Sequence, residues 1–183
     1  MERGISDMII DALEERPASE GEARSAFAEA VLAGLARRPR SIPCRFFYDA
    51  RGSELFEAIT VLPEYYPTRT ETGLLQSFGR EIAQEIREAE LLVEFGSGSS
   101  RKTSLLLAAL PRVNTYVPID VSSASLEEAG DWLGSRHPDL DIRPLIADFT
   151  TIRTLPPEAR GRRRVGFFSG STIGNLTQTD ARA

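Results

Sequence analysis

Hydrophobic residues near the start of the chain recur at helical spacing. Phe27, Val31 and Leu35 fall at positions i, i+4 and i+8, which places them on one face of a helix. Ser19 and Glu22 precede this stripe with the spacing of a capping box, in which each side chain bonds the other residue's backbone N–H. The pattern therefore predicts an amphipathic helix that begins near residue 20.

Two further helices are predicted before residue 90. A short one is expected over 53–60, followed by an extended segment in which Pro63 and Pro67 bracket two tyrosines. Thr68 and Glu71 then form a second capping-box spacing at the start of a long helix. The apolar stripe of that helix comprises Leu74, Leu75, Phe78, Ile82 and Ile86.

After residue 90 the pattern changes to short apolar runs that alternate with helical stretches. Strands are predicted at 91–95, 115–119, 142–147 and 165–169, and helices at 102–110, 122–136 and from about 176. Alternation of this kind is typical of an α/β fold with a mostly parallel sheet joined by right-handed crossovers. We predict a Rossmann-like domain over 90–183, preceded by an N-terminal helical segment over 1–89.

Composition narrows the classes of function. The 183 residues are 41% hydrophobic and 27% charged with a net charge of -5, which disfavours a nucleic-acid or anionic-membrane surface. The beginning of the chain is acidic and has no apolar signal core, so a cytoplasmic location is predicted. Cys44 and His137 are the sole residues of their types, which excludes an internal disulfide and a Cys/His zinc site; no metal is predicted.

Residues that could bind a ligand lie where the predicted strands end. Gly96 and Gly98 follow the first strand, Asp120 the second and Asp148 the third. In open α/β sheets, ligands bind outside the carboxyl ends of the strands. The glycines permit a tight turn close to a ligand, and Asp120 is 24 positions after Gly96, near the offset of a ribose-binding acid. The sequence therefore predicts a site for an adenosine-containing ligand.

The residues at this site fit three classes of adenosine ligand to different degrees. NAD requires a third glycine where this chain has Arg101. The segment GSGSSRKT at 96–103 differs from the phosphate-binding loop motif at this same position, where the motif also requires glycine. A nucleotide phosphatase remains a minor alternative. S-adenosylmethionine needs a glycine turn, a ribose acid and an adenine-side acid, and all three are present.

Long motifs of the chain resemble the histidine-specific methyltransferase family, the L-histidine Nα-methyltransferases of the ergothioneine pathway. The similar segments are FFYDARGSELFEAITVLPEYYPTRTE, LVEFGSGSSRKT, YVPIDVS, ADF and FFSGSTIGNL, which run from about residue 45 to 176. The resemblance implies S-adenosylmethionine-dependent transfer of three methyl groups to the α-amino group of L-histidine, giving hercynine.

The same resemblance assigns roles to individual residues. On the cofactor it places Gly96, Lys102, Asp120, Asp148 and Phe149. On the substrate it places Tyr65 against the imidazole, Asn175 on the carboxylate, and Tyr48 and the Gly170 backbone near the amino group, with Tyr48 as the catalytic residue. Lys102 could reach the cofactor carboxylate or buttress the glycine turn. By spacing alone, Tyr65 could equally cap the core, and Asn175 could cap a helix from about 176.

Family members continue beyond the last residue of this sequence, so we expect the domain to be incomplete at its C-terminus. The predicted partner is the small molecule L-histidine, with neither nucleic acid nor membrane. A partial sheet would expose one side, and a partner chain could complete it. The alternative to an enzyme is a non-catalytic remnant that binds an adenosine-containing ligand or a partner chain.

Overall fold

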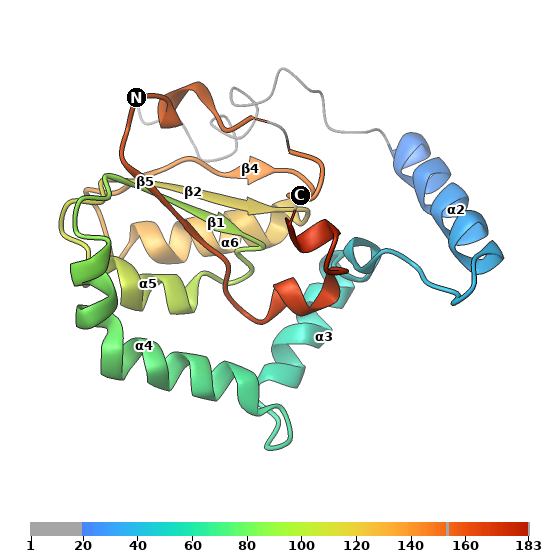
Figure 1. The fold of residues 1–183 in the computed structure, drawn as a ribbon, viewed down its shortest axis with the longest axis horizontal. Coiled ribbons are helices and arrows are strands. Elements are labelled where there is room, and N and C mark those ends of the chain that lie inside the picture. The colour runs from blue at the N-terminus through green and yellow to red at the C-terminus, as the bar shows by residue number, and fades with distance from the viewer. Residues whose placement is uncertain (1–19, 153, 183) are drawn as a thin grey trace.

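A parallel β-sheet forms the centre of the protein. The computed structural model describes residues 20–152 and 154–182. Within these ranges the strands are β1 (Leu91–Phe95), β2 (Thr115–Asp120), β3 (Asp141–Ile142), β4 (Leu145–Ile146) and β5 (Arg164–Phe167). They are ordered β3-β2-β1-β5, with β4 also on β2, and every pair is parallel (Figure 1). Since β1 lies between β2 and β5, the order reverses beside β1.

Three helices cover one face of this sheet: α4 (Tyr66–Glu85), α5 (Arg101–Leu107) and α6 (Ser123–Gly134) (Figure 1). The apolar cluster beneath them joins Leu92 and Tyr116 of the strands to Ala83, Leu106 and Leu133 of the helices. Burial of this apolar surface is the main force that holds helices and sheet together.

Neighbouring residues of β1 point to opposite faces, as in any strand. Leu91 and Val93 belong to a second cluster with Val117 and Leu145. The irregular segment between β4 and β5 covers this face and contributes Ala159, which is completely buried. Both faces of β1 are therefore buried, which explains its nearly unbroken apolar sequence.

The N-terminal part consists of α2 (Glu20–Ala36), the 3-10 helix η1 (Cys44–Phe47), α3 (Ala50–Thr60) and α4. Helix α2 stands apart from the sheet, and the edge-to-face contact of Phe27 with Phe46, at 5.2 Å between ring centroids, joins it to η1 (Figure 1). Helix α3 begins where the Asp49 carboxylate accepts the Gly52 N–H at 2.7 Å. Among the described residues, no helix is both long and apolar enough to cross a bilayer.

The predicted Rossmann-like class is confirmed, and three local predictions are wrong. The strand expected over 142–147 is broken into β3 and β4 at Pro144, which has no N–H to donate to a neighbouring strand. The helix expected from about 176 is absent from the described chain. Short 3-10 turns, η3 (Thr172–Asn175) and η4 (Asp180–Arg182), lie there, and a further one, η2 (Pro157–Ala159), precedes β5.

The third error concerns the start of α4. The segment around Pro63 is a turn rather than an extended strand, and α4 begins at Tyr66 with Pro67 in its first turn. Glu71 consequently lies inside the helix, where it makes tertiary contacts instead of capping. The first capping box includes Ser19, which lies outside the described residues.

Candidate functional site

A glycine turn connects β1 to α5 at the point where the strand order reverses. Gly96 has φ +69° and Gly98 has φ +50°, values that L-residues rarely adopt. A Cβ added to Gly96 would lie 3.5 Å from Thr172 Cγ2 and 3.6 Å from the Phe149 ring, while one added to Gly98 would meet no described atom within 4 Å. The turn is thus packed at its beginning and borders open space at its middle.

Asp120 closes this turn from the end of β2. Its Oδ2 accepts the N–H of Gly98 and its Oδ1 accepts the N–H of Ser122, each at 3.0 Å. A carboxylate has about four acceptor positions, so about two remain for hydroxyl donors. The carboxylate predicted to bind ribose is therefore fixed in place and retains free acceptor capacity.

The Ser97 hydroxyl provides a test of whether a polar ligand fits here. This oxygen is buried in the middle of the glycine turn, and it has no hydrogen-bond partner among the described residues. Buried hydroxyls are nearly always hydrogen-bonded in native proteins. An unpaired one beside the glycine turn and Asp120 fits a site whose polar ligand supplies the missing partner.

Asp148 lies in the loop after β4. Its Oδ1 accepts the backbone N–H and the hydroxyl of Thr150, at 2.9 and 2.6 Å, and its Oδ2 accepts from Arg45 at 2.7 Å. Burial raises the Asp148 pKa, but the hydrogen bonds from Thr150 and Arg45 outweigh it, so the pKa lies below its ordinary value. The neighbouring Phe149 ring packs edge-to-face on Phe168, at 5.2 Å between centroids. An acid beside an aromatic ring is the arrangement predicted for adenine.

The residues predicted to hold the substrate come together beside this turn. Tyr48 and Asn175 are far apart in the sequence, yet the Asn175 side chain lies close enough to the Tyr48 hydroxyl to lower its pKa. The Tyr48 ring packs on Phe56 at 5.9 Å, and Phe56 packs on Tyr65 at 6.0 Å. Asn175 ends η3 and does not precede a helix, so the helix-cap alternative is wrong.

Tyr48 connects the two halves of the site. Partial burial raises its pKa above the ordinary value, while the hydrogen bond from Asn175 acts in the opposite direction. The negative charge of Asp120 acts on the same hydroxyl and raises its pKa further. The phenol is therefore protonated at neutral pH and lies within electrostatic reach of the predicted ribose acid.

Lys102 contacts a carboxylate that the sequence did not single out for ligand chemistry. Its Nζ lies 2.5 Å from Glu71 Oε2, which also accepts the Gly170 N–H at 3.0 Å. Lys102 therefore contacts α4 rather than the glycine turn, and its predicted role at the cofactor stays a prediction.

Sequence reasoning also missed Glu94 in the middle of β1. Its carboxylate is completely buried and accepts hydrogen bonds from Thr103 and Tyr116, each at 2.5 Å, and from Ser169 at 2.8 Å. Burial raises the Glu94 pKa to about 7, although these three hydroxyls and the Lys102 charge lower it. The available signal was an acid inside an otherwise apolar strand, since such groups are almost never buried unless paired.

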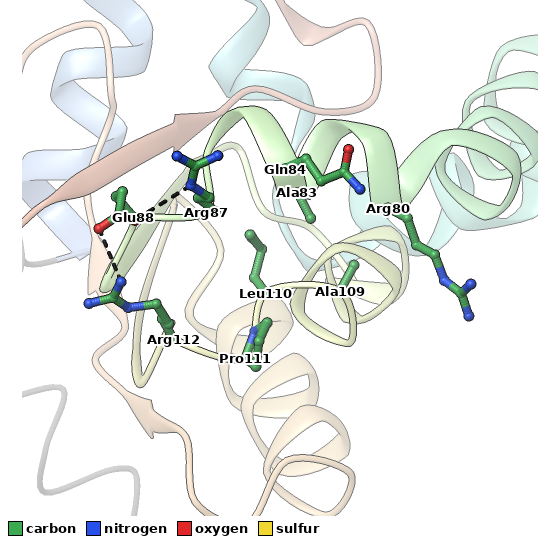
Figure 2. Close-up of a pocket in the computed structure, with 9 residues that line it drawn as sticks. All are labelled: Arg80, Ala83, Gln84, Arg87, Glu88, Ala109, Leu110, Pro111 and Arg112. Atoms are coloured by element: carbon green, nitrogen blue, oxygen red, sulfur yellow. Dashed lines mark hydrogen bonds and ion pairs between the residues drawn. The ribbon is translucent and has the colours of Figure 1, made fainter.

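A groove lined by arginines lies at the other end of the sheet. Glu88 pairs there with Arg87 and Arg112, and Leu110 forms part of the wall (Figure 2). Glu88 and Arg112 precede β1 and β2 in the chain, so this groove lies at the amino ends of the strands. The predicted site is at the carboxyl ends, and the groove contributes no residue to it.

The parallel Rossmann-like sheet, with a glycine turn, a strand-end acid and an acid–aromatic pair at its switch point, defines the class of S-adenosylmethionine-dependent methyltransferases. The sequence profile of one family within that class, described as histidine-specific and S-adenosylmethionine-dependent, matches residues 27–183. The chain belongs to this histidine-specific methyltransferase family. In the two described ranges, no group of three or more His, Cys, Asp or Glu side chains is placed to hold a metal ion.

Named proteins with similar sequences support the same family assignment. The chain is 45% identical over 150 residues to the histidine N-alpha-methyltransferase of Mycolicibacterium smegmatis, covering 80% of this chain and 46% of that protein. It is 44% identical to that of Mycobacterium tuberculosis, with the same coverage. Identity is 27% over 162 residues with the 4-dimethylallyltryptophan N-methyltransferase of Claviceps purpurea, covering 85% and 47%. The chain thus spans just under half the length of each relative.

Proposed function

We propose that this chain forms the cofactor-binding part and the amine side of the acceptor site in an enzyme that methylates the α-amino group of L-histidine to give hercynine, a reaction of ergothioneine biosynthesis. The observation that supports this most directly is the position of Tyr48. The Asn175 side chain and the Asp120 carboxylate both lie close enough to its hydroxyl to shift its pKa. Residues predicted for the substrate therefore lie beside one predicted for the cofactor.

The glycine turn and Asp120 would hold the nucleoside part of S-adenosylmethionine. The backbone at Gly98 borders open space, the Ser97 hydroxyl lacks a partner in the described chain, and Asp120 retains acceptor positions. Asp148 and Phe149 would hold the adenine. When bound, the cofactor supplies an electrophilic methyl group on a positively charged sulfur.

The acceptor amine must be neutral, because its nitrogen lone pair forms the new bond. Tyr48 is suited to orient that amine, since its raised pKa keeps the phenol uncharged and its oxygen can accept an amine N–H. Asn175 fixes the phenol and would itself bind the substrate carboxylate. The protein then acts mainly by positioning the amine and excluding water, and the amine proton leaves to solvent.

The 1–89 segment contributes to the substrate site in this proposal, and the 90–183 domain contributes the cofactor site. The acceptor is assigned as histidine because identity is higher to the histidine N-alpha-methyltransferases than to the 4-dimethylallyltryptophan enzyme. The acceptors named for these two relatives are both amino acids that carry an aromatic side chain, so a comparison of free histidine with tryptophan tests the assignment.

The cofactor half is tested by calorimetric titration of the chain with S-adenosylhomocysteine, using NAD and Mg-ATP as controls. We expect saturable binding of S-adenosylhomocysteine alone, and its loss in Asp120→Ala. Asp131→Ala, at an exposed position of α6, is the matched control and should bind normally. Binding of NAD or Mg-ATP instead would contradict the assignment.

Transfer is tested by incubating the chain with S-adenosylmethionine and either histidine or tryptophan, with mass-spectrometric detection of methylated products. We expect methylated histidine. Cofactor binding without transfer to either amino acid would count against catalysis by this chain and favour a binding role. Transfer to tryptophan in preference would overturn the acceptor assignment.

A further inference from the structure

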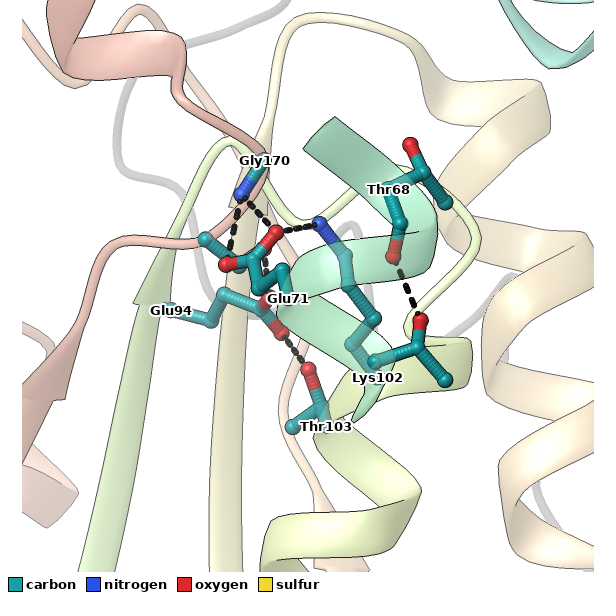
Figure 3. A network of polar contacts seen from close by, with 8 residues as sticks. Thr68, Glu71, Glu94, Lys102, Thr103 and Gly170 are labelled. Carbon is teal, nitrogen blue, oxygen red and sulfur yellow. Dashed lines mark hydrogen bonds and ion pairs between the residues drawn. The ribbon is translucent and has the colours of Figure 1, made fainter. Parts of the chain in front are cut away.

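A carboxylate on α4 joins three parts of the site that are distant in sequence. Glu71 Oε2 lies 2.5 Å from Lys102 Nζ on α5, and the Gly170 N–H lies 3.1 and 3.0 Å from Oε1 and Oε2 (Figure 3). Gly170 follows β5, at the switch point of the sheet. One side chain thus connects the helix that starts beside Tyr65, the helix that follows the glycine turn, and the loop after β5.

These contacts differ from an ordinary surface ion pair. The Lys102 and Glu71 side chains are 19% and 28% exposed, so water screens them only partly. A carboxylate that accepts a backbone N–H and an ammonium N–H forms charge-assisted hydrogen bonds, about twice as strong as neutral ones. The exposed Arg51–Glu54 pair of α3, with side chains 73% and 67% exposed, shows the contrast.

The Gly170 amide needs this acceptor. Gly170 has φ +74°, and the chain leaves β5 there, so its N–H is not engaged by a neighbouring strand. Glu71 holds the N–H of the peptide that joins Ser169 to Gly170, and Glu94 accepts the Ser169 hydroxyl at 2.8 Å. Two carboxylates thereby hold two consecutive residues at the place predicted for the acceptor amine.

We propose that Glu71 is a positioning residue for methyl transfer, acting through the Gly170 amide and through Lys102. This inference rests on the proposed function. Glu71 touches neither substrate nor cofactor in this scheme. It fixes the distance between the start of α4, which carries Tyr65, and the loop at Gly170, so that the acceptor amine and the methyl group stay in line.

The test compares Glu71→Ala with Glu81→Ala, an exposed position further along the same helix that serves as matched control. Loss of a charge-assisted bond predicts a fall in kcat of about tenfold to a hundredfold in Glu71→Ala. The affinity for S-adenosylhomocysteine should change by less than about threefold, because no cofactor contact is removed. A loss confined to KM, or equal losses in both variants, would overturn the proposal.

Glu71→Gln separates geometry from charge. Its amide oxygen can still accept the Gly170 N–H, so it should recover part of the kcat that Glu71→Ala loses. A role limited to balancing the Lys102 charge predicts instead that Glu71→Gln is as slow as Glu71→Ala. That pattern would overturn the part of the proposal that runs through Gly170.

A readout independent of activity is the amide signal of Gly170 in a ¹⁵N-labelled chain. In the wild type we expect slow exchange with solvent, and in Glu71→Ala a shifted signal with faster exchange, while Glu81→Ala leaves it unchanged. If the wild-type chain binds S-adenosylhomocysteine but methylates neither amino acid, the proposed function fails, and this signal alone decides whether Glu71 holds the loop. A Gly170 signal that does not respond to Glu71→Ala would overturn the inference even in an active enzyme.

Discussion

The Glu94 carboxylate accepts a hydrogen bond from the Ser169 hydroxyl at 2.8 Å, across 75 positions of sequence. Glu94 lies in the central strand, and Ser169 lies in the loop after the strand beside it. Because the carboxylate is completely buried and Thr103 and Tyr116 also donate to it, this contact belongs to the core of the switch point. A polar network of this kind fixes geometry only while every member is satisfied.

The first prediction concerns the pH dependence of stability. The Glu94 pKa is about 7 in the folded state and ordinary when unfolded, so between roughly pH 4.5 and 7 the folded state holds a proton that the unfolded chain has lost. The free energy of unfolding should therefore fall as pH rises through this window, by roughly 3 kcal/mol, and then level off. Urea unfolding at a series of pH values measures this slope.

Glu94→Gln cannot titrate and should flatten that slope, whereas Glu81→Gln, at an exposed position, should keep it. The difference between wild type and Glu94→Gln isolates the Glu94 contribution from other titrating groups. An unchanged slope in Glu94→Gln would show that another group is responsible.

The second prediction separates backbone strain from crowding at Gly170. Alanine at position 170 would have to adopt an unfavourable positive φ. Its Cβ would lie 3.3 Å from Lys102 Nζ and would displace the ammonium from Glu71. Gly161 has a similar φ of +70° but open space around its added Cβ. Each substitution to Ala should cost about 1 kcal/mol in strain, and only Gly170→Ala should also slow methyl transfer. Thermal unfolding and initial rates measure the two effects, and equal rates in both variants would contradict the prediction.

The third prediction concerns Arg45, whose guanidinium lies 2.7 Å from Asp148 Oδ2. Arg45→Met removes one of the groups that lower the Asp148 pKa, so that pKa should rise towards its ordinary value. The stabilisation by ionised Asp148 is present above its unfolded pKa and is lost as pH falls through its folded pKa. Arg45→Met should move that loss to higher pH. An NMR titration of the Asp148 carboxyl carbon measures the change.

Arg51→Met is the matched control for Arg45→Met, because Arg51 pairs with the exposed Glu54 on the neighbouring helix. It should leave the Asp148 titration unchanged. If both variants shift it equally, a general change in net charge is responsible.

The fourth prediction concerns the Tyr48 hydroxyl. Tyr48→Phe keeps the ring contact with Phe56 and removes the hydroxyl that lies near the Asn175 side chain. We expect kcat to fall about tenfold, the value of one hydrogen bond in the transition state, with little change in S-adenosylhomocysteine affinity. Tyr66→Phe alters a ring that is 67% exposed and should be neutral. A loss of cofactor affinity in Tyr48→Phe would contradict the predicted role.

The strands β1 and β2 were predictable from sequence because both are buried on their two faces and are therefore mostly apolar. The same runs placed Gly96 and Asp120 at the carboxyl edge of the sheet without any knowledge of tertiary contacts. The predicted start of α4 is wrong because the pattern assigns Pro67 to an extended segment before the helix, although proline is well tolerated in a first helical turn.

Glu71 and Glu94 could not be identified in this way. The spacing of Glu71 from Thr68 fits a local cap, and its true partners Lys102 and Gly170 lie on other elements. The donors to Glu94 likewise come from α5, β2 and the loop after β5. Local pattern carries no information on contacts across such separations, and they emerge only when the sheet assembles.

The interruption at Pro144 affects how the sheet can grow. In the described sheet, the outer side beyond β2 offers the two-residue strands β3 and β4, separated by Arg143 and by Pro144, which lacks an N–H. So short and broken a margin is a poor template for another strand, which protects the protein against edge-to-edge aggregation. The four residues of β5, Arg164–Phe167, form the longer margin of the described sheet. Of the two edges of the described sheet, β5 is therefore the one better suited to pair with another strand, and it lies next to the loop that Glu71 and Glu94 hold.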